Sequence, residues 1–392
     1  MPRVSIIVPT YNRAHTITRA LDSLLVQTYP DLEIIVVDDG STDSTRDILA
    51  GYDDRVRYHY QQNAGPAAAR NTGIRMARGE FIGFLDSDDT VSPTKVALQV
   101  ALLDARPEID WVVTGVQMIA EDGETVLEEI VTFNVDEILK EILLTVSRGL
   151  FPPHVPLMRR ECIERVGLFD ETLPAREEQD FWIRVAMAGC KAALIEQALC
   201  QFWITAGSRG QNLSNVQRAY PRILDKVFSN PDLPPAVLAL KEDLYARAYL
   251  EFGLYHLRHS RTEVGSEMDA ARAYFIKAHT LRSAILTWRQ NHFNDFDVLP
   301  YKAIELDPQD PEACLRRLFK SLFAGVSVPD WLLPRLLSRL HVILAFRAHE
   351  AGERSQVVAH MLRGAYYYPG AMRDRGTASV FLRSLLRLPV GN

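Results

Sequence analysis

Two groups of carboxylates follow apolar segments in the first hundred residues of this sequence. Asp38 and Asp39 come after the apolar run 33–37, and Asp86-Ser87-Asp88-Asp89 follows the apolar run 81–85. A hard divalent cation such as Mg²⁺ or Mn²⁺ prefers oxygen ligands, and one or two carboxylates together with substrate phosphates suffice to hold it. The Asp-Ser-Asp pattern therefore predicts a site for a metal ion and a phosphate-bearing ligand. Taken alone, such a pattern is more often an Asp-rich turn that caps a helix.

A second acidic group opens a predicted amphipathic helix that runs to Gly189; it consists of Glu177, Glu178 and Asp180. A carboxylate within hydrogen-bond reach of a hydroxyl group can act as a general base and remove its proton. The dipole of the helix favours the charged form of such a side chain, whereas burial opposes it. Asp180 stands four residues before Arg184, so an ion pair on the helix surface also explains it without any chemistry.

The elements that must hold these groups alternate between strands and helices over the first 120 residues. Such alternation predicts βαβ units, and hence a mostly parallel sheet with helices on both faces. Ligands of such sheets bind beyond the carboxyl ends of the strands, which brings the segment 9–12 to the same rim as Asp39 and Asp88. Strands are predicted at 4–8, 33–37, 56–60, 81–85 and 111–118, and helices at 14–27, 67–77 and 93–103. A further helix, which the segment 42–45 can cap, is predicted to run to about residue 50.

The pattern becomes wholly helical from about residue 220 onward. We therefore predict an α/β domain over 1–218, made of a ligand-binding half at 1–120 and a second half at 121–218, followed by an all-helical region at 219–392. The helical region is faintly repeat-like, but it has no regular period of about 34 residues. Its amphipathic stretches lie at 244–257, 268–280 and 357–366.

Four short segments around the carboxylates form one pattern of fixed order and spacing. They are Val4-Ser5-Ile6-Ile7-Val8-Pro9-Thr10-Tyr11-Asn12, Val36-Val37-Asp38-Asp39-Gly40-Ser41, Gly65-Pro66-Ala67-Ala68-Ala69-Arg70-Asn71 and Phe84-Leu85-Asp86-Ser87-Asp88-Asp89. Together they resemble the nucleotide-sugar-binding half of glycosyltransferase family 2. The resemblance covers about residues 1–120 and, less closely, 150–215. It implies the GT-A fold, a Rossmann-like and mostly parallel sheet, and an inverting sugar transfer with Mn²⁺ or Mg²⁺ as cofactor.

Carried over to this chain, the resemblance implies a donor site at the rim. Asp39 would accept a hydrogen bond from the base of a pyrimidine nucleotide, Asp86 would lie by the ribose, and Asp88 would hold the metal ion on the diphosphate. Arg70 would face the phosphates or the sugar, with a structural salt bridge as the alternative. For Asp38 a turn carboxylate that binds backbone N–H groups is favoured. The predicted donor-site residues are Pro9, Tyr11, Asn12, Asp39, Arg70, Asp86, Ser87 and Asp88.

The same resemblance implies a catalytic base on the predicted helix. Alignment on the Trp and Arg of that helix places Glu178 at the base position and Asp180 at a later acidic position. The family more commonly has Asp at the base position, so the choice between Glu178 and Asp180 stays open. His154 is expected either to touch a substrate or to be structural. The segment 203–214 resembles a loop that covers the donor, and it contains no His that could bind the metal ion.

These features predict a metal-dependent inverting glycosyltransferase that uses a UDP- or dTDP-sugar. Its acceptor would be a saccharide, a lipid-linked or another hydroxyl compound, in polysaccharide, glycolipid or glycoconjugate synthesis. The alternative is a catalytically degenerate transferase domain that serves as a binding module or scaffold through its helical tail. A dinucleotide dehydrogenase would need G-x-G-x-x-G after the first strand, and a sugar-nucleotide pyrophosphorylase would need a Gly-rich basic loop there. The segment 8–13, Val-Pro-Thr-Tyr-Asn-Arg, is neither.

Charge and cysteine content limit the partners and the location. The 392 residues carry a formal net charge of −6, whereas a protein that binds nucleic acid normally carries a basic excess, so no nucleic-acid partner is expected. The four cysteines show neither CxxC nor metal-ligand spacing. They therefore predict buried free thiols in a reducing compartment, and hence a cytoplasmic protein.

The last part of the chain differs in charge from the rest. Residues 313–392 contain 12 Lys and Arg but only 4 Asp and Glu. Together with a stripe of leucines at 332–340, this charge is compatible with peripheral docking on an anionic membrane, at its inner face, or on a partner protein. A solvated, basic helical domain that packs on the acidic catalytic half is slightly favoured over docking. Proline and basic residues interrupt the apolar stretch 331–346, so no membrane span is expected.

Overall fold

The computed structural model describes residues 2–120, 125–130, 134–145, 152–203, 213–282, 298–324, 326, 328 and 330–367. The chain divides into two compact units, Met1–Leu233 and Pro234–Asn392. The first unit contains the sheet and the second is helical throughout its described residues.

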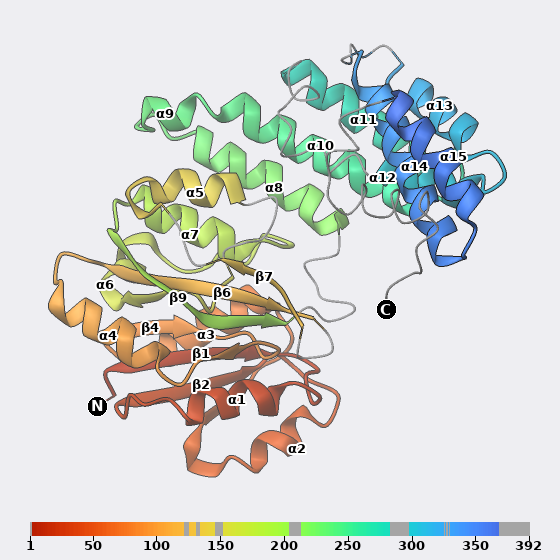
Figure 1. Ribbon diagram of the computed structural model, residues 1–392. Helices are drawn as coiled ribbons and strands as arrows, with labels where there is room; N and C mark the ends of the chain where they lie inside the picture. The colour runs from red at the N-terminus through yellow and green to blue at the C-terminus, as the bar shows by residue number, and fades with distance from the viewer. Residues whose placement is uncertain are drawn as a thin grey trace. The chain divides into compact units, whose positions relative to one another are not determined.

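A single mixed sheet forms the centre of the first unit (Figure 1). Its strands are β1 (Val4–Thr10), β2 (Leu32–Asp38), β3 (Arg57–Tyr60), β4 (Phe81–Phe84), β5 (Thr90–Val91), β6 (Trp111–Ile119), β7 (Val126–Ile130), β8 (Leu157–Arg159) and β9 (Ala192–Trp203). They lie in the order β3-β2-β1-β4-β8-β6-β9-β5, and β7 pairs with β6. The pairs among β1 to β4 and the pair β6–β9 are parallel, whereas β8 is antiparallel to both of its neighbours.

Most helices of the first unit are eight residues or longer. On the first of them, Ile17, Ala20, Leu21 and Leu24 are buried at a spacing of three and four residues, as expected of one helical face. The helices of the first unit are α1 (Ile17–Leu25), α2 (Thr45–Ala50), α3 (Pro66–Met76), α4 (Lys95–Ala105), α5 (Ile138–Thr145), α6 (Arg160–Val166), α7 (Glu177–Met187) and α8 (Leu213–Phe228). Both α5 and α6 pack against α7 (Figure 1).

The predicted fold class is confirmed, and the strands and helices predicted for residues 1–120 are present with ends that differ by a few residues. The sequence did not predict the short strand β5 or the antiparallel pairs that β5 and β8 make. Strands of two and three residues are too short to show an alternating pattern. Their place is set by the neighbours with which they pair.

The boundary between the units lies further along the chain than the predicted 218/219. That boundary would cut through α8, which carries the buried residues Ala219, Tyr220, Ile223 and Leu224. In addition, Lys226 of this helix forms ion pairs within the first unit. The helix therefore belongs to the first unit, because its apolar face and its charges are engaged there.

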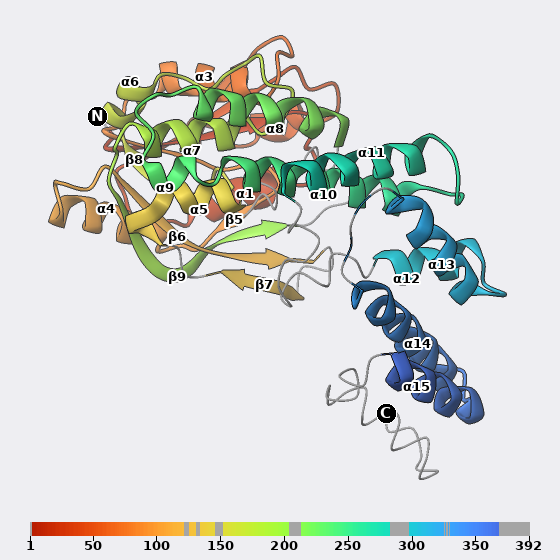
Figure 2. The same ribbon diagram turned by 90° about the horizontal axis from the view of Figure 1, so that it is seen from above.

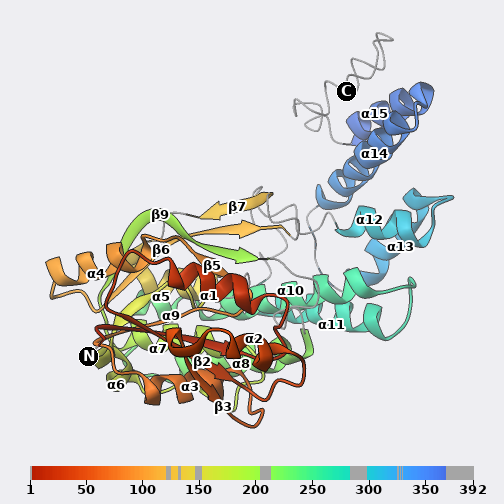
Figure 3. The ribbon, with the colours of Figure 1, turned by 90° about the horizontal axis from the view of Figure 1, so that it is seen from below.

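The second unit is built from helices that pair along the chain. They are α9 (Pro235–Leu238), α10 (Lys241–His259), α11 (Ser266–Leu281), α12 (Val298–Leu306), α13 (Pro311–Leu322), α14 (Leu332–Glu350) and α15 (Arg354–Tyr367). Helices α10 and α11 pack side by side (Figure 2), and so do α14 and α15 (Figure 3). This confirms the helical region predicted from the sequence.

The leucine stripe of α14 is not available for docking. Leu332, Leu336, Leu337 and Leu340 are buried in the core of the helical unit, and Leu333 packs against the same core. The expectation that this stripe docks on a membrane or a partner is therefore wrong, because the unit uses it to bury its own apolar surface. No helix in the described part of the chain qualifies as a membrane span.

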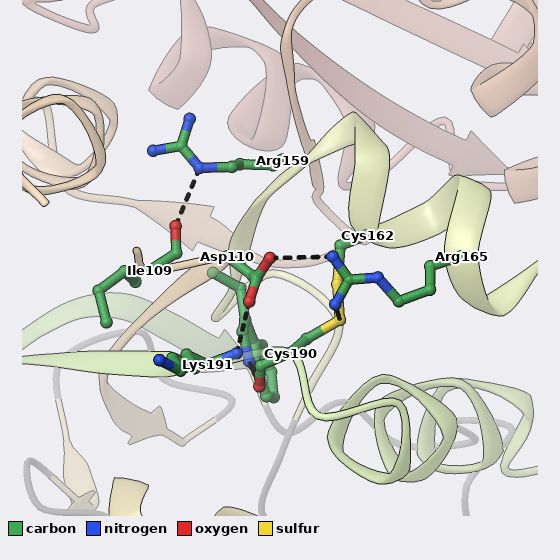
Figure 4. The surroundings of a disulfide bond; sticks show 8 residues. Ile109, Asp110, Arg159, Cys162, Arg165, Cys190 and Lys191 are labelled. Atoms are coloured by element: carbon green, nitrogen blue, oxygen red, sulfur yellow. Dashed lines mark hydrogen bonds and ion pairs between the residues drawn. A yellow bond between two sulfur atoms is a disulfide. The ribbon is translucent and has the colours of Figure 1, made fainter. Parts of the chain in front are cut away.

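Two of the four cysteines are joined, contrary to the prediction of free thiols. Cys162 on α6 and Cys190, just beyond α7, form a disulfide, beside which Arg165 reaches both Cys190 Sγ and Asp110 (Figure 4). The other two, Cys200 and Cys314, are free and buried. The two cysteines of the disulfide are 28 residues apart, and only the packing of α6 against α7 brings them together.

Candidate active site

A cleft of about 890 Å³ opens at the carboxyl ends of β1, β2 and β4. One wall comes from the loops that follow these strands, and the other comes from the start of α7 and the end of β9. A volume of this size is in the range of pockets that hold small molecules and cofactors. The predicted site residues that line it are Pro9, Tyr11, Asp39, Arg70, Asp86, Ser87, Asp88 and Glu178.

Asp39 is buried directly after β2 and has one carboxylate position left for a ligand. Its Oδ1 accepts hydrogen bonds from Gln61 Nε2 at 2.8 Å and from the backbone N–H of Ala64 at 2.9 Å, and its Oδ2 accepts one from Gly65 N at 2.8 Å. A carboxylate offers about four acceptor positions, so these contacts leave one on Oδ2. Asp39 thus holds the start of α3 and can still accept an N–H from a base.

Asn12 joins two loops of the rim instead of lining the cleft. Its backbone N–H donates to Ser41 Oγ at 2.9 Å, and its Oδ1 accepts from the backbone N–H groups of Thr42 at 2.7 Å and Asp43 at 3.3 Å. Among the described residues that line the cleft, Asn12 is absent. Asp38 behaves as the predicted turn carboxylate, since its Oδ1 accepts from Ser41 N at 2.8 Å.

The turn after β4 concentrates negative charge in the cleft. Asp88 is half-buried, and its Oδ2 lies 3.6 Å from Arg13 Nε. Burial and the neighbouring charges of Asp89 and Asp86 raise the pKa of Asp88 to about 6. A cation beside this carboxylate would relieve both costs, and a hard oxygen donor suits Mg²⁺ or Mn²⁺. The residues present therefore fit such an ion.

Protein side chains alone do not complete a metal site here. In the described part of the chain, no three His, Cys, Asp or Glu side chains are grouped so as to hold a metal ion. An ion at Asp88 would therefore take its other ligands from the oxygens of a diphosphate and from water, as Mg²⁺ commonly does.

Asp89 and His154 form a buried pair behind the cleft. His154 Nδ1 lies 3.1 Å from Asp89 Oδ2, and the two side chains are 0% and 2% exposed. The other oxygen, Asp89 Oδ1, accepts the backbone N–H of Trp203 at 2.9 Å. This settles the two alternatives for His154 in favour of the structural one. The sequence did not single out Asp89, since only the fold brings residues 89, 154 and 203 together.

Arg70 is clamped between two carboxylates. Its Nη2 donates to Asp86 Oδ1 at 2.8 Å and its Nη1 donates to Glu177 Oε1 at 2.7 Å, and the side chain is 5% exposed. Burial lowers the pKa of Arg70, but Asp86 and Glu177 raise it more, so the guanidinium stays charged. The predicted salt bridge is present, and Arg70 also lines the cleft. Glu177, which the sequence offered only as a member of an acidic group, joins α7 to Arg70 of α3.

Stacked aromatic rings hold α7 in place. Trp182 of α7 stacks on Trp111 of β6 with ring centroids 5.9 Å apart, and Phe181 stacks on Phe169 at 4.2 Å. All of these rings are buried. The aromatic face of the helix therefore fixes the position of its first turn, which carries Glu178 into the cleft wall.

Glu178 has the properties of a general base. It is half-buried in the cleft wall. Burial and the adjacent charge of Glu177 raise the pKa of Glu178 to about 7, although Arg176 and Arg70 act in the opposite direction. A carboxylate whose pKa lies near neutral pH is basic enough to accept a proton, and at that pH a large fraction of the molecules carries it in the deprotonated form.

Asp180 is engaged in ion pairs beneath the cleft. Its Oδ2 accepts from Arg184 Nε at 2.9 Å and its Oδ1 from Lys226 Nζ at 3.1 Å, and its side chain is 3% exposed. Arg184 in turn donates to the backbone carbonyls of Val166 and Leu168. Asp180 is not among the described residues that line the cleft. Its contacts match the ion-pair alternative and tie α7 to α8.

Comparison with known proteins places the first part of the chain in one family. The profile of Glycosyl transferase family 2 matches residues 5–167. An uncharacterized glycosyltransferase of Rickettsia felis is 35% identical over 188 residues, which are 47% of this chain and 31% of that protein. The putative teichuronic acid biosynthesis glycosyltransferase TuaG of Bacillus subtilis is 31% identical over 222 residues, which are 54% of this chain and 82% of TuaG.

The fold also matches a solved structure. The crystal structure of S. aureus TarS 1–349 in complex with UDP-GlcNAc has a TM-score of 0.51 at 21% sequence identity, and the match covers 93% of this chain and 91% of that chain. This chain spans about a third of the length of the Rickettsia felis protein, so that relative extends well beyond the part compared.

The ion pairs of Asp180 predict a structural effect for its replacement. We expect Asp180→Asn to lower the free energy of unfolding by about 1–3 kcal/mol, because it weakens buried hydrogen bonds to two charged groups. Nucleotide binding should be unchanged, since Asp180 lies outside the cleft lining. Urea unfolding followed by tryptophan fluorescence measures the first quantity and calorimetry the second. Unchanged stability together with lost nucleotide binding would contradict the structural role.

Proposed function

Because the chain belongs to glycosyltransferase family 2, we propose that it transfers a sugar from a nucleoside diphosphate to a hydroxyl group of an acceptor. The observation that carries this proposal is the position of Glu178. Its raised-pKa carboxylate lies in the same cleft as Asp39, Asp86 and Asp88, so a base for the acceptor faces the carboxylates expected at a donor.

The donor occupies the side of the cleft formed by β1, β2 and β4. Asp39 accepts an N–H of the base through its remaining acceptor position, which favours the pyrimidine donors UDP-sugar and dTDP-sugar. Pro9 and Tyr11 line the same side. Asp86 is oriented by Arg70, and Ser87 and Asp88 continue the turn toward the diphosphate.

The chemical step is a direct displacement at the anomeric carbon. The acceptor oxygen forms a bond to that carbon while the bond from the carbon to the diphosphate oxygen breaks. Glu178 takes the proton of the acceptor hydroxyl, which makes the oxygen a competent nucleophile. Attack from the side opposite the leaving group inverts the configuration of the sugar.

The diphosphate leaves with a negative charge that the two guanidinium groups on the donor side of the cleft do not neutralise in full. Arg70 is held by Asp86 and Glu177, and Arg13 lies beside Asp88. We propose that Asp88 holds a Mn²⁺ or Mg²⁺ ion. The ion supplies electrostatic stabilisation of the leaving diphosphate.

The acceptor belongs to a cell-envelope polysaccharide or a related glycoconjugate under this proposal. Its support is the relationship to TuaG, whose name assigns it to teichuronic acid synthesis and of which the aligned region covers 82%. The residues that would hold donor and base all lie in the first unit, which also contains the family match over residues 5–167.

Replacement of the base is the sharpest test of this function. We expect Glu178→Gln to slow sugar transfer by about 10²- to 10⁴-fold, which is the typical contribution of a general base. Binding of the nucleotide sugar should stay close to that of the wild type, because the donor contacts lie on the other wall. Transfer is measured by release of the nucleoside diphosphate, and binding by calorimetry.

Asp180→Asn serves as the matched control for this variant, since it removes a charge from the same helix outside the cleft. If Glu178→Gln keeps wild-type turnover while Asp180→Asn loses it at a temperature where both are folded, the base is Asp180. If both variants keep wild-type turnover, neither carboxylate is the base.

The raised pKa of Glu178 predicts how the rate depends on pH. Only the deprotonated carboxylate can accept the proton of the acceptor, so turnover should rise with pH through about 7 and level off above it. The charged groups that act on this carboxylate are Glu177, Arg176 and Arg70. A turnover that falls as the pH rises from 6 to 8 would contradict a basic role for Glu178.

The proposed metal site predicts how binding of the nucleotide sugar depends on Asp88 and on Mn²⁺. We expect Asp88→Asn to weaken binding of the nucleotide sugar in Mn²⁺ by about tenfold or more, and to make binding insensitive to chelator, because the anchoring charge is lost. The wild type should bind the donor more weakly when chelator is added. Titrations of both proteins with and without Mn²⁺ measure these effects. Full wild-type turnover in excess chelator would contradict the metal-dependent mechanism.

A further inference from the structure

Arg176 is a charged residue of the cleft to which the proposed function assigns no role. It directly precedes α7, is half-buried and lines the cleft. Its backbone is left-handed, with φ of 63° and ψ of 25°, a conformation that side chains with a Cβ rarely adopt. Such strained residues cluster at sites that use them. The long cationic side chain of Arg176 thus lies in the lining of the cleft, directly before the first turn of α7.

The guanidinium of Arg176 is incompletely paired within the described part of the chain. Its Nε is buried and has no hydrogen-bond partner in the described residues. In the same part of the chain, no carboxylate lies within ion-pair distance of it, whereas Arg13 is near Asp88 and Arg70 is held by two carboxylates. A buried donor without a partner is costly, and a ligand that supplies an acceptor removes that cost.

Many of the uncharged residues that line the cleft are apolar or aromatic. Those of the segments 152–153, 173–175 and 202–203 are Pro152, Pro153, Leu173, Pro174, Ala175, Phe202 and Trp203. Rings and prolines of this kind suit the apolar face of a sugar, and they offer little to an anion. Arg176, two residues before Glu178, is a cationic lining residue with no carboxylate within ion-pair distance among the described residues, so it is placed to meet a negative charge near the base.

We propose that Arg176 binds an anionic group, a phosphate or a carboxylate, on the acceptor close to the hydroxyl that reacts. This inference rests on the proposed function, because it takes Glu178 as the base and this wall as the acceptor side. A planar guanidinium can bind both oxygens of such a group and so orient the hydroxyl toward Glu178. Arg176 is then a specificity-determining residue, and neutral acceptors are poorer substrates than their anionic counterparts.

The test compares small anionic probes with their neutral counterparts on the full chain. The protein is loaded with Mn²⁺ and with whichever of UDP and dTDP raises its melting temperature, so that the diphosphate position is filled. Binding is then measured by calorimetry for glycerol 3-phosphate against glycerol and for glucuronate against glucose. The first pair reports on phosphate and the second on carboxylate recognition. We expect at least one anion to bind about tenfold or more tightly than its neutral counterpart in the wild type.

The variants separate anion binding from other roles. Arg176→Gln should lose the preference for the anion, and Arg176→Lys should retain part of it. Arg106→Gln, which removes an exposed arginine at the end of α4, should behave as the wild type. Absence of any preference in the wild type, or a preference that survives Arg176→Gln, overturns the inference.

A purely electrostatic effect of Arg176 on Glu178 gives a different result. Since Arg176 lowers the pKa of Glu178, Arg176→Gln would then move the pH profile of turnover upward and leave the anion preference intact. That result also overturns the inference. Failure of the wild type to bind either nucleotide contradicts the proposed function itself, and it is recognised before any acceptor probe is added.

Discussion

The clamp of Arg70 between Asp86 and Glu177 is the interaction on which the rest of the cleft depends. Its two short hydrogen bonds, of 2.8 and 2.7 Å, join the turn after β4 to the first turn of α7, and the guanidinium that makes them is buried. In a buried setting the attraction between such charges is strong, but the arrangement is stable only while every partner is present. Asp88 follows Asp86 by two residues, and Glu178 follows Glu177 by one. The clamp therefore sets the separation between the carboxylate that would hold a metal ion and the carboxylate that would act as base.

The same clamp explains the charge state of the cleft. Because the positive charge of Arg70 is already balanced, Asp88 and Glu178 remain crowded by their acidic neighbours, and burial raises the pKa of each. These two carboxylates lie on opposite walls and have different uses in the proposed reaction. At Asp88 the excess of negative charge attracts a cation, and at Glu178 it attracts a proton. In the proposed reaction, the excess negative charge in the cleft thus favours both a cation near the leaving diphosphate and proton transfer from the attacking hydroxyl group.

The two units are stabilised separately. The helical unit buries the leucines of α14 in a core shared by α10 to α13, while the first unit packs the aromatic face of α7 on the sheet. Each unit has enough apolar surface to form its own core, as expected of domains of this size. The described lining of the cleft comes wholly from the first unit, whose relatives carry the glycosyltransferase designation.

The longer strands of residues 1–120 and the carboxylates at their ends could be predicted from the sequence, because buried parallel strands are visible as short apolar runs and their carboxyl ends share one rim. Glu178 came from the resemblance to the family, with Asp180 left open beside it, and its role as base is a proposal. The partners that the polar side chains take follow from the tertiary structure and could not be predicted. Arg70 meets Glu177 across 107 residues of sequence, Asp89 meets His154, Asn12 turns to the loop at 41–43, and Cys162 joins Cys190. A polar side chain binds whatever the fold brings within about 3 Å of it, and that neighbourhood is a property of packing between distant segments, which no local pattern contains.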